Sequence, residues 1–314
     1  MAAPAPRQTL ARRLAGGQPS YRRGDGRAAI LFLLPGFVPF LLFTVLGVLA
    51  TAGLSLAHWD LVASPRWAGL DNYKALFDDD VFRQVLRNTA LYALGVVPIS
   101  TGLALLAAVG LNLRLRGSLA LRAAYFTPYI TPLFAAALIF QWIYDPRAGL
   151  IDSALYAIGV AHPPAWLNST TWALPALIIF GIWQQIGFSI VLFLAGLQGV
   201  DRSVQEAASV DGAGRWATFR YVTFPLISPT TFFVAVITTI GSFQVFDQAY
   251  VMTSGRFSPD NATNTIVGYL FQKAFVTANT DYGLPSAVGW LLFLLVFAVT
   301  MLQFGVQRRW VHYD

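Results

Sequence analysis

Six long apolar runs, nearly free of charged residues, constrain this chain more than any other feature of its sequence. An α-helix needs about 20 mainly apolar residues to cross the ~30 Å hydrocarbon layer of a bilayer. Membrane-spanning β-strands would be shorter and would alternate strictly between apolar and polar residues. The runs therefore predict an all-α integral membrane protein with six transmembrane helices. They cover residues 28–57, 89–111, 119–144, 172–199, 226–252 and 284–306.

The composition agrees with this class. Hydrophobic residues make up 56% of the chain and charged residues only 11%, as in membrane proteins with several spans. The absence of cysteine excludes disulfides, thiolate metal sites and cysteine nucleophiles. His58, His162 and His312 lie far apart in the sequence and outside the apolar runs, so no metal site is predicted.

The distribution of basic residues predicts how the chain is oriented. If the N-terminus is cytoplasmic and six spans alternate, 14 of the 21 Lys and Arg residues fall in cytoplasmic segments and 7 fall in external loops. This bias follows the positive-inside rule and predicts that both termini are cytoplasmic. It also accounts for the net charge of +6, so no nucleic-acid partner is predicted.

The N-terminal 27 residues differ from the rest. Residues 1–27 are rich in Ala, Pro, Gly and Arg, which predicts a disordered, basic, cytoplasmic segment before a membrane domain at 28–314. A signal peptide is the alternative, but its apolar core would span only about 7–15 residues. An uncleaved first helix is therefore preferred, with a kink or tilt expected at Pro35 and Pro39. The connection 58–88 has helix-like apolar spacing and is predicted to contain a short surface helix.

The chain lacks a nucleotide-binding loop. Its only two lysines, Lys74 and Lys273, do not follow a glycine, so the phosphate-cradling pattern G-x-x-x-x-G-K-[ST] is absent. If transport uses ATP, another chain must hydrolyse it.

A polar segment, "EAASVDGAGRWATFRYVTFP", separates the fourth and fifth runs and contains the only glutamate, Glu206. Asp201 or Ser203 can cap a short helix that Gly212 ends, and residues 215–222 can form a second one. Small side chains would let another protein approach these two short helices closely. The Glu206 carboxylate could pair with an arginine on that protein. An ordinary solvated loop is the alternative.

This segment resembles the signature of permease subunits of bacterial ATP-binding-cassette (ABC) importers, which is Glu-Ala-Ala, three residues, Gly, nine residues, Ile-x-Leu-Pro. The corresponding positions are Glu206, Ala207, Ala208, Gly212 and Pro225, and Asp211 and Ala213 also match the Asp-Gly-Ala that is usual in this family. Val222 and Phe224 replace the isoleucine and leucine, apolar for apolar. The stretches "GLDNYKALF", "WQQIGFSIVLFLAGLQGV", "GSFQVFDQAYVMTSG" and "DYGLPSA" resemble the carbohydrate-importer branch, in particular the first of its two permeases. That permease type serves maltose, trehalose-like sugars or glycerol-3-phosphate.

The resemblance implies a type I ABC importer permease fold in the lipid bilayer of the bacterial inner membrane. It also implies that the loop at about 201–225 couples the chain to a separate ATPase. The implied partners are a second permease in a heterodimer, two ABC ATPase subunits that bind ATP and Mg, and an extracytoplasmic substrate-binding protein. No catalytic role, metal or cofactor is expected on this chain, and the sugar is not identified.

Polar side chains inside the bundle are candidates for the substrate path, because polar groups that face lipid are costly. They are Gln184, Gln185 and Phe188 in the fourth run and Ser242, Gln244, Asp247 and Gln248 in the fifth. Amides beside aromatic rings suit a sugar, but glutamines in membrane helices also bond to neighbouring helices. Asp247 would lie only ~7–8 Å from the outer end of a continuous fifth helix, where it could gate the path or pair helices.

Two other functions are open at this point. A secondary transporter driven by an ion gradient would explain the spans and Asp247, but it would leave the Glu206 signature unexplained. An intramembrane enzyme would need a nucleophile, paired carboxylates or a metal cluster, and Asp247 alone provides none of these.

Overall fold

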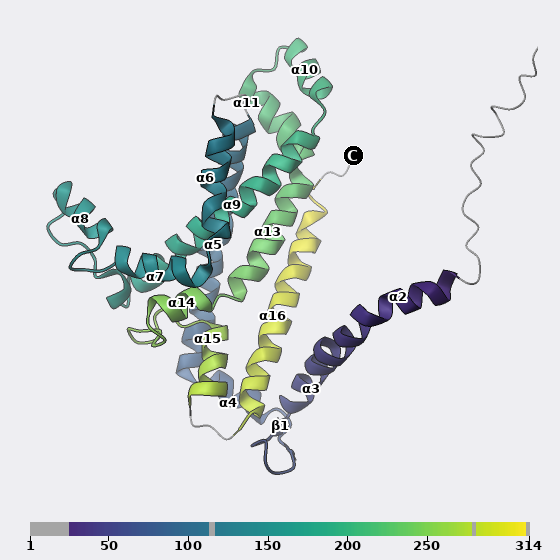
Figure 1. The fold of residues 1–314 in the computed structure, drawn as a ribbon, viewed down its shortest axis with the longest axis vertical. Coiled ribbons are helices and arrows are strands. Elements are labelled where there is room, and N and C mark those ends of the chain that lie inside the picture. The colour runs from purple at the N-terminus through teal and green to yellow at the C-terminus, as the bar shows by residue number, and fades with distance from the viewer. Residues whose placement is uncertain (1–24, 113–116, 278–280, 312–314) are drawn as a thin grey trace, which may run out of the picture. The chain divides into compact units, whose positions relative to one another are not determined.

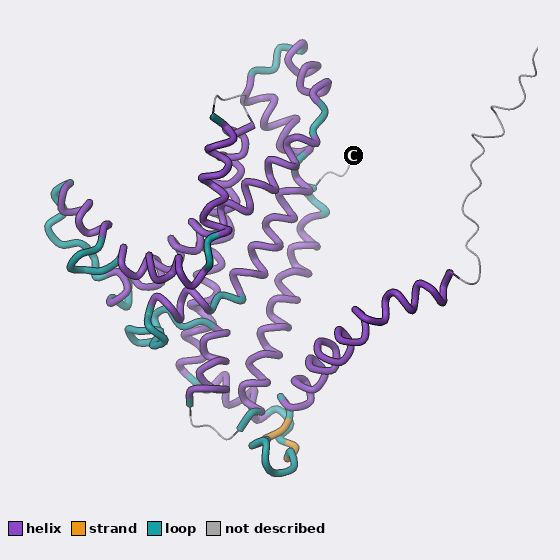
Figure 2. Tube along the Cα trace, viewed as in Figure 1, coloured by secondary structure: helices purple, strands orange, loops and turns teal. Residues whose placement is uncertain are grey.

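The computed structural model describes residues 25–112, 117–277 and 281–311, and this part of the chain is mostly helical (Figure 2). The chain divides into two units, Met1–Thr51 and Ala52–Asp314.

The first unit contains one apolar helix. Helix α2 (Asp25–Pro39) continues through a π-helical turn (Phe40–Val45) into α3 (Leu46–Leu54). The π-helical turn begins directly after Pro39, which has no N–H to donate to the helix ladder. Residues 1–24 of the predicted disordered segment (1–27) lie outside the described residues.

Three unbroken helices of the second unit are long and apolar enough to cross a membrane. They are α5 (Asp80–Asn112), α9 (Ala173–Gly199) and α16 (Gly283–Gln307). They correspond to the predicted second, fourth and sixth runs, although α5 begins at Asp80 rather than at residue 89. Together with α2–α3, the described residues hold four such helices, or up to six spans if each bent helix pair counts as one.

The predicted third run, 119–144, is not one straight helix. It forms α6 (Ser118–Ile130) and α7 (Leu133–Ile143), which meet at an angle of 96°. Pro132 disfavours helical backbone at Thr131, whose φ of −67° and ψ of 131° are extended. The proline therefore explains where the run bends.

The predicted fifth run, 226–252, is interrupted twice. The first interruption is a 65° bend before α13 (Ser228–Phe243). The chain reaches this bend through α11 (Arg215–Thr218), a π-helical turn (Phe219–Thr223) and α12 (Phe224–Leu226). The chain leaves the helix again before α14 (Asp247–Met252). The Thr265 hydroxyl donates a hydrogen bond to the Val245 carbonyl oxygen at 2.7 Å within this second gap. Non-helical backbone is tolerated inside a membrane bundle where its polar groups are satisfied in this way.

Short elements form the connections. Strands β1 (Ala57–His58) and β2 (Arg66–Trp67) pair antiparallel, and α4 (Asp71–Asp78) confirms the predicted surface helix in 58–88. The other short elements are α8 (Leu150–Ala157), a 3-10 turn (Trp166–Asn168), α10 (Arg202–Val210), α15 (Ile266–Phe271) and a π-helical turn (Gln272–Val276).

The core of the second unit lies along α9, which packs against α5, α6 and α13. Two stretches of α9 carry fully buried side chains. They are Leu177 and Phe180 on the first stretch and Ile190 and Phe193 on the second. In Figure 1, α10 and α11 lie at one end of this unit, and α4, α15 and β1 lie at the other. The polar segment around Glu206 and the connection 58–88 are thus at opposite ends of the bundle.

Candidate substrate path and coupling loop

A cavity of about 290 Å³ opens beside the middle of α9, between side chains of α5, α9, α13 and α14. Gln184 lies eleven residues after the first residue of α9, or ~17 Å along the helix, about half the thickness of the hydrocarbon layer. Six of the seven predicted path residues line this cavity. They are Gln184, Gln185, Ser242, Gln244, Asp247 and Gln248.

Phe188, the seventh candidate, is not among the residues that line the cavity. Its ring stacks on Tyr129 of α6, with 4.8 Å between the ring centroids. This contact joins α9 to α6.

The four glutamines of the cavity divide into two pairs. Gln185 donates a hydrogen bond to the Thr238 hydroxyl at 3.4 Å, and Gln248 donates one to the Tyr92 hydroxyl at 3.1 Å. These two amides therefore tie helices together. The side chains of Gln184 and Gln244 make no hydrogen bond with the described residues, so their amides are free to meet a ligand.

The position of Asp247 along the bundle differs from the depth expected from the sequence. The depth of ~7–8 Å assumed a continuous fifth helix. That helix ends at Phe243, and Asp247 begins α14 beyond the gap. Its side chain lines the same cavity as Gln184, halfway along α9.

Tyr92, which sequence reasoning missed, shapes the wall together with Gly181, which shares a helix face with Gln184 and Gln185. Tyr92 of α5 is 3% exposed and lines the cavity beside Gly181 of α9. A Cβ on Gly181 would overlap the Tyr92 hydroxyl, so only glycine permits this close approach. Nothing in the sequence brings Tyr92 to residues of the fourth and fifth runs, because their proximity depends on how α5 packs against α9.

The loop around Glu206 folds as two short helices, as predicted. The Asp201 carboxylate accepts a hydrogen bond from the Ser203 amide at 2.9 Å and caps α10. The same backbone hydrogen bond, and one from the Ser203 side chain, lower the pKa of Asp201.

The C-terminus of α10 is closed by two backbone hydrogen bonds. The Ala213 amide donates to the Ala208 carbonyl at 2.9 Å, and the Gly212 amide donates to the Ser209 carbonyl at 3.1 Å. This is the Schellman arrangement, which requires a left-handed residue after the helix. Gly212 supplies it, with φ of +82°.

The tip of this loop, which we call the coupling loop (residues 201–225), presents apolar and acidic side chains to solvent. Val210 is 88% exposed and Trp216 is 73% exposed. Glu206 is also exposed and forms no ion pair with the described residues. The loop therefore leaves two large apolar side chains and one carboxylate in contact with solvent.

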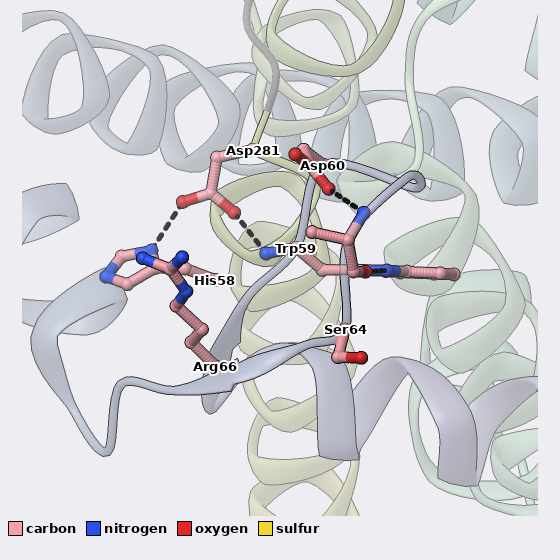
Figure 3. Close-up of a pocket in the computed structure, with 7 residues that line it drawn as sticks. His58, Trp59, Asp60, Ser64, Arg66 and Asp281 are labelled. Atoms are coloured by element: carbon pink, nitrogen blue, oxygen red, sulfur yellow. Dashed lines mark hydrogen bonds and ion pairs between the residues drawn. The ribbon is translucent and has the colours of Figure 1, made fainter.

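A second cavity, of about 260 Å³, lies beside the hairpin of β1 and β2 (Figure 3). Asp281 joins this hairpin to the start of α16. Its carboxylate accepts hydrogen bonds from the amides of Trp59 at 3.1 Å and Gly283 at 2.9 Å, and it lies 2.5 Å from His58 Nδ1. These contacts hold two loops together, and none of these residues lines the cavity along α9.

Comparisons with known proteins cover most of the chain. Residues 81–313 match the family described as "Binding-protein-dependent transport system inner membrane component". The probable ABC transporter permease protein YesP of Bacillus subtilis is 36% identical, with 93% of this chain and 94% of that protein covered. The lactose transport system permease protein LacF of Rhizobium radiobacter is 32% identical, with 89% and 93% covered.

The fold has a solved counterpart. A chain of a bacterial ABC transporter involved in the import of alginate matches with a TM-score of 0.78 and 21% identity, and 91% of this chain and 96% of that one are covered. This likeness supports the type I importer permease fold predicted from the sequence. The family match covers the cavity and the coupling loop together. This chain therefore belongs to the inner membrane components of binding-protein-dependent transport systems, the permeases of ABC transporters.

Proposed function

We propose that this chain is the permease subunit of an ATP-driven importer of sugars or sugar derivatives. The polar cavity halfway along α9 supports this most directly, because amides, hydroxyls and one carboxylate face it from several helices. Hydroxyl-rich ligands match such donors and acceptors. The lactose permease that the chain resembles supports the same substrate class.

The proposed complex contains a second permease, two ATPase subunits that bind ATP and Mg, and an extracytoplasmic binding protein. The chain itself contributes neither catalysis nor a cofactor. Both termini face the cytoplasm, on the side where the coupling loop docks on an ATPase. The signature residues are Glu206, Ala207, Ala208, Asp211, Gly212, Ala213 and Pro225.

A continuous route connects this docking surface to the cavity. Within the coupling loop, the chain runs from α10 through α11 and α12 to the bend at Ile227, and α13 extends from there to Phe243. Sixteen residues of α13 span ~24 Å. Ser242 and Gln244, at the far end of α13, line the cavity. Movement of the loop by a closing ATPase dimer would therefore tilt α13 and open or close the cavity wall.

Affinity purification from native membranes in mild detergent tests this composition. We expect an ABC ATPase and a second permease to co-purify with the wild-type chain. With Glu206→Lys, the ATPase should be lost while the second permease remains, because only the cytoplasmic contact is changed. Recovery of this chain alone, with transport activity after reconstitution, would favour the ion-driven transporter instead.

A further inference from the structure

The cavity along α9 contains a single charged side chain among the described residues that line it. Asp247 is that residue, and no Lys, Arg or His of the described chain lines the cavity. The remaining polar groups are the amides of the four glutamines and the hydroxyls of Tyr92, Thr238 and Ser242. The described lining of this cavity therefore carries negative charge and no positive charge.

The Asp247 carboxylate is not used to hold the fold together. It forms no ion pair and no side-chain hydrogen bond with any described residue. It also does not cap α14, although it is the first residue of that helix. The Asp247 side chain is exposed to the open cavity, whereas Asp152, which is 4% exposed, accepts a hydrogen bond from the Trp166 indole at 2.6 Å.

Uncharged side chains without partners add to the polar surface that a ligand can reach. The Gln184 and Gln244 amides also lack partners among the described residues, whereas Gln185 and Gln248 are bonded to other helices. A ligand in the cavity would thus meet one carboxylate, two amides and the Ser242 hydroxyl, which also has no partner among the described residues. A carboxylate accepts hydrogen bonds from hydroxyl groups, and an amide both donates and accepts them.

We propose that Asp247 makes this path selective for uncharged, hydroxyl-rich sugars over sugars that bear a carboxylate, sulfonate or phosphate. The inference rests on the proposed function and assigns it a substrate class. A sugar hydroxyl can donate to the Asp247 carboxylate, and charge-assisted hydrogen bonds of this kind are the stronger ones. An acidic sugar would bring a second negative charge beside the Asp247 carboxylate, and the two like charges would repel each other. No cation among the described lining residues offsets it.

Saturation-transfer NMR on the purified complex, without its binding protein, tests this selectivity directly. The probes are lactose, maltose and cellobiose, each compared with the matching aldonate, namely lactobionate, maltobionate or cellobionate. The variant is Asp247→Asn, which keeps the shape of the side chain and removes its charge. The control is Asp260→Asn, which removes an exposed external carboxylate that does not line this cavity.

The wild-type complex should bind at least one uncharged sugar and should bind its aldonate at least fivefold more weakly. Asp247→Asn should reduce that ratio to below twofold, and Asp260→Asn should leave it unchanged. Equal binding of both members by the wild type, or an unchanged ratio in Asp247→Asn, would overturn the inference and leave the proposed function standing. If no variant binds a sugar of either series, the proposed function itself fails.

Discussion

At the scale of single residues, the cavity depends on a glycine and a tyrosine that lie far apart in the sequence. Gly181 of α9 leaves room for the hydroxyl of Tyr92, and that hydroxyl accepts a hydrogen bond from Gln248. The three residues come from α9, α5 and α14, so one contact point fixes the spacing of three helices. Its geometry therefore controls the size of the cavity.

Gly181→Ala should destabilise the protein by about 1–3 kcal/mol, because the added methyl overlaps the Tyr92 hydroxyl. Thermal unfolding of the purified complex measures this loss. Gly241→Ala is the matched control, since Gly241 lines the same cavity with open space where a Cβ would lie and should tolerate the methyl. Gly181→Ala should cost less in a Tyr92→Phe background than in the wild type, a comparison that cancels the loss of the Gln248 hydrogen bond, and an equal cost would contradict the contact.

Gly212 is the second residue whose backbone decides a local structure. Gly212→Ala places a side chain at φ of +82°, at a cost of about 1–2 kcal/mol. The strain should disfavour the docked loop by a factor of about 5 to 30 and reduce the amount of ATPase that co-purifies. Gly214→Ala is the control, because Gly214 has φ of −68° and open space around it. Equal retention of ATPase by both variants would show that the left-handed turn is not needed for docking.

At the scale of elements, the break between α13 and α14 positions Asp247, and Thr265 supports this break. Thr265→Val removes the hydroxyl that donates to the Val245 carbonyl, which leaves a buried acceptor unsatisfied at a cost of about 1–3 kcal/mol. Chemical denaturation of the complex should show this loss. Thr265→Ser, which retains the hydroxyl, should stay within about 1 kcal/mol of the wild type. Equal stability of the valine and serine variants would contradict a role for this hydrogen bond.

The corner between α4 and α5 contacts α15 through Asp79. Partial burial raises the pKa of Asp79, but hydrogen bonds from the Tyr269 hydroxyl and the Val81 amide, together with Lys273, outweigh it and lower the pKa below its ordinary value. A lowered folded-state pKa means that the carboxylate stabilises the fold above the unfolded-state value and loses this effect as the pH falls through the folded-state value. The pH window therefore lies below about pH 4.

The stability of the wild type should fall more steeply than that of Asp79→Asn as the pH decreases from about 5 to about 3. Urea denaturation at several pH values measures the difference, with Asp78→Asn as the control on an adjacent exposed carboxylate. Parallel pH profiles for the wild type and Asp79→Asn would contradict the role assigned to this carboxylate.

The sequence predicts some elements well because their causes are local. The coupling loop follows from Asp201 as a cap and Gly212 as a left-handed stop, and both lie within a few residues of α10. The bend at Thr131 also has a local cause in Pro132, although the apolar run around it concealed the bend. The gap after Phe243 has no such signal, since residues 244–246 contain neither glycine nor proline. It depends on the distant Thr265, so its position could not be predicted.

The same distinction applies to the cavity. Gln184 and Gln185 lie three and four residues after Gly181, a helical spacing that predicts one shared face of α9, and both line the cavity. It could not show that Gln185 is bonded to Thr238 while Gln184 is free, because α13 supplies that partner. Phe188 shares the face but packs on α6, whose bend was not expected.

At the scale of the whole molecule, we expect a partner ATPase to move the coupling loop and thereby to change the cavity proposed to bind sugar. In the second unit, the coupling loop lies at the end opposite α4 and α15, and the cavity lies partway along the helices that connect the two ends (Figure 1). A motor bound at the loop could therefore change the cavity without touching it.

Sugar accumulation in proteoliposomes is the measurement that tests this coupling most directly. The purified complex and its binding protein would be reconstituted, with ATP supplied on one side and no ion gradient. We predict that uptake requires ATP on the side of the coupling loop. Glu206→Lys should abolish uptake while its amount in the membrane is unchanged, and Glu206→Gln should lose less because it does not reverse the charge. Normal uptake by Glu206→Lys, or accumulation driven by an ion gradient without ATP, would contradict the account.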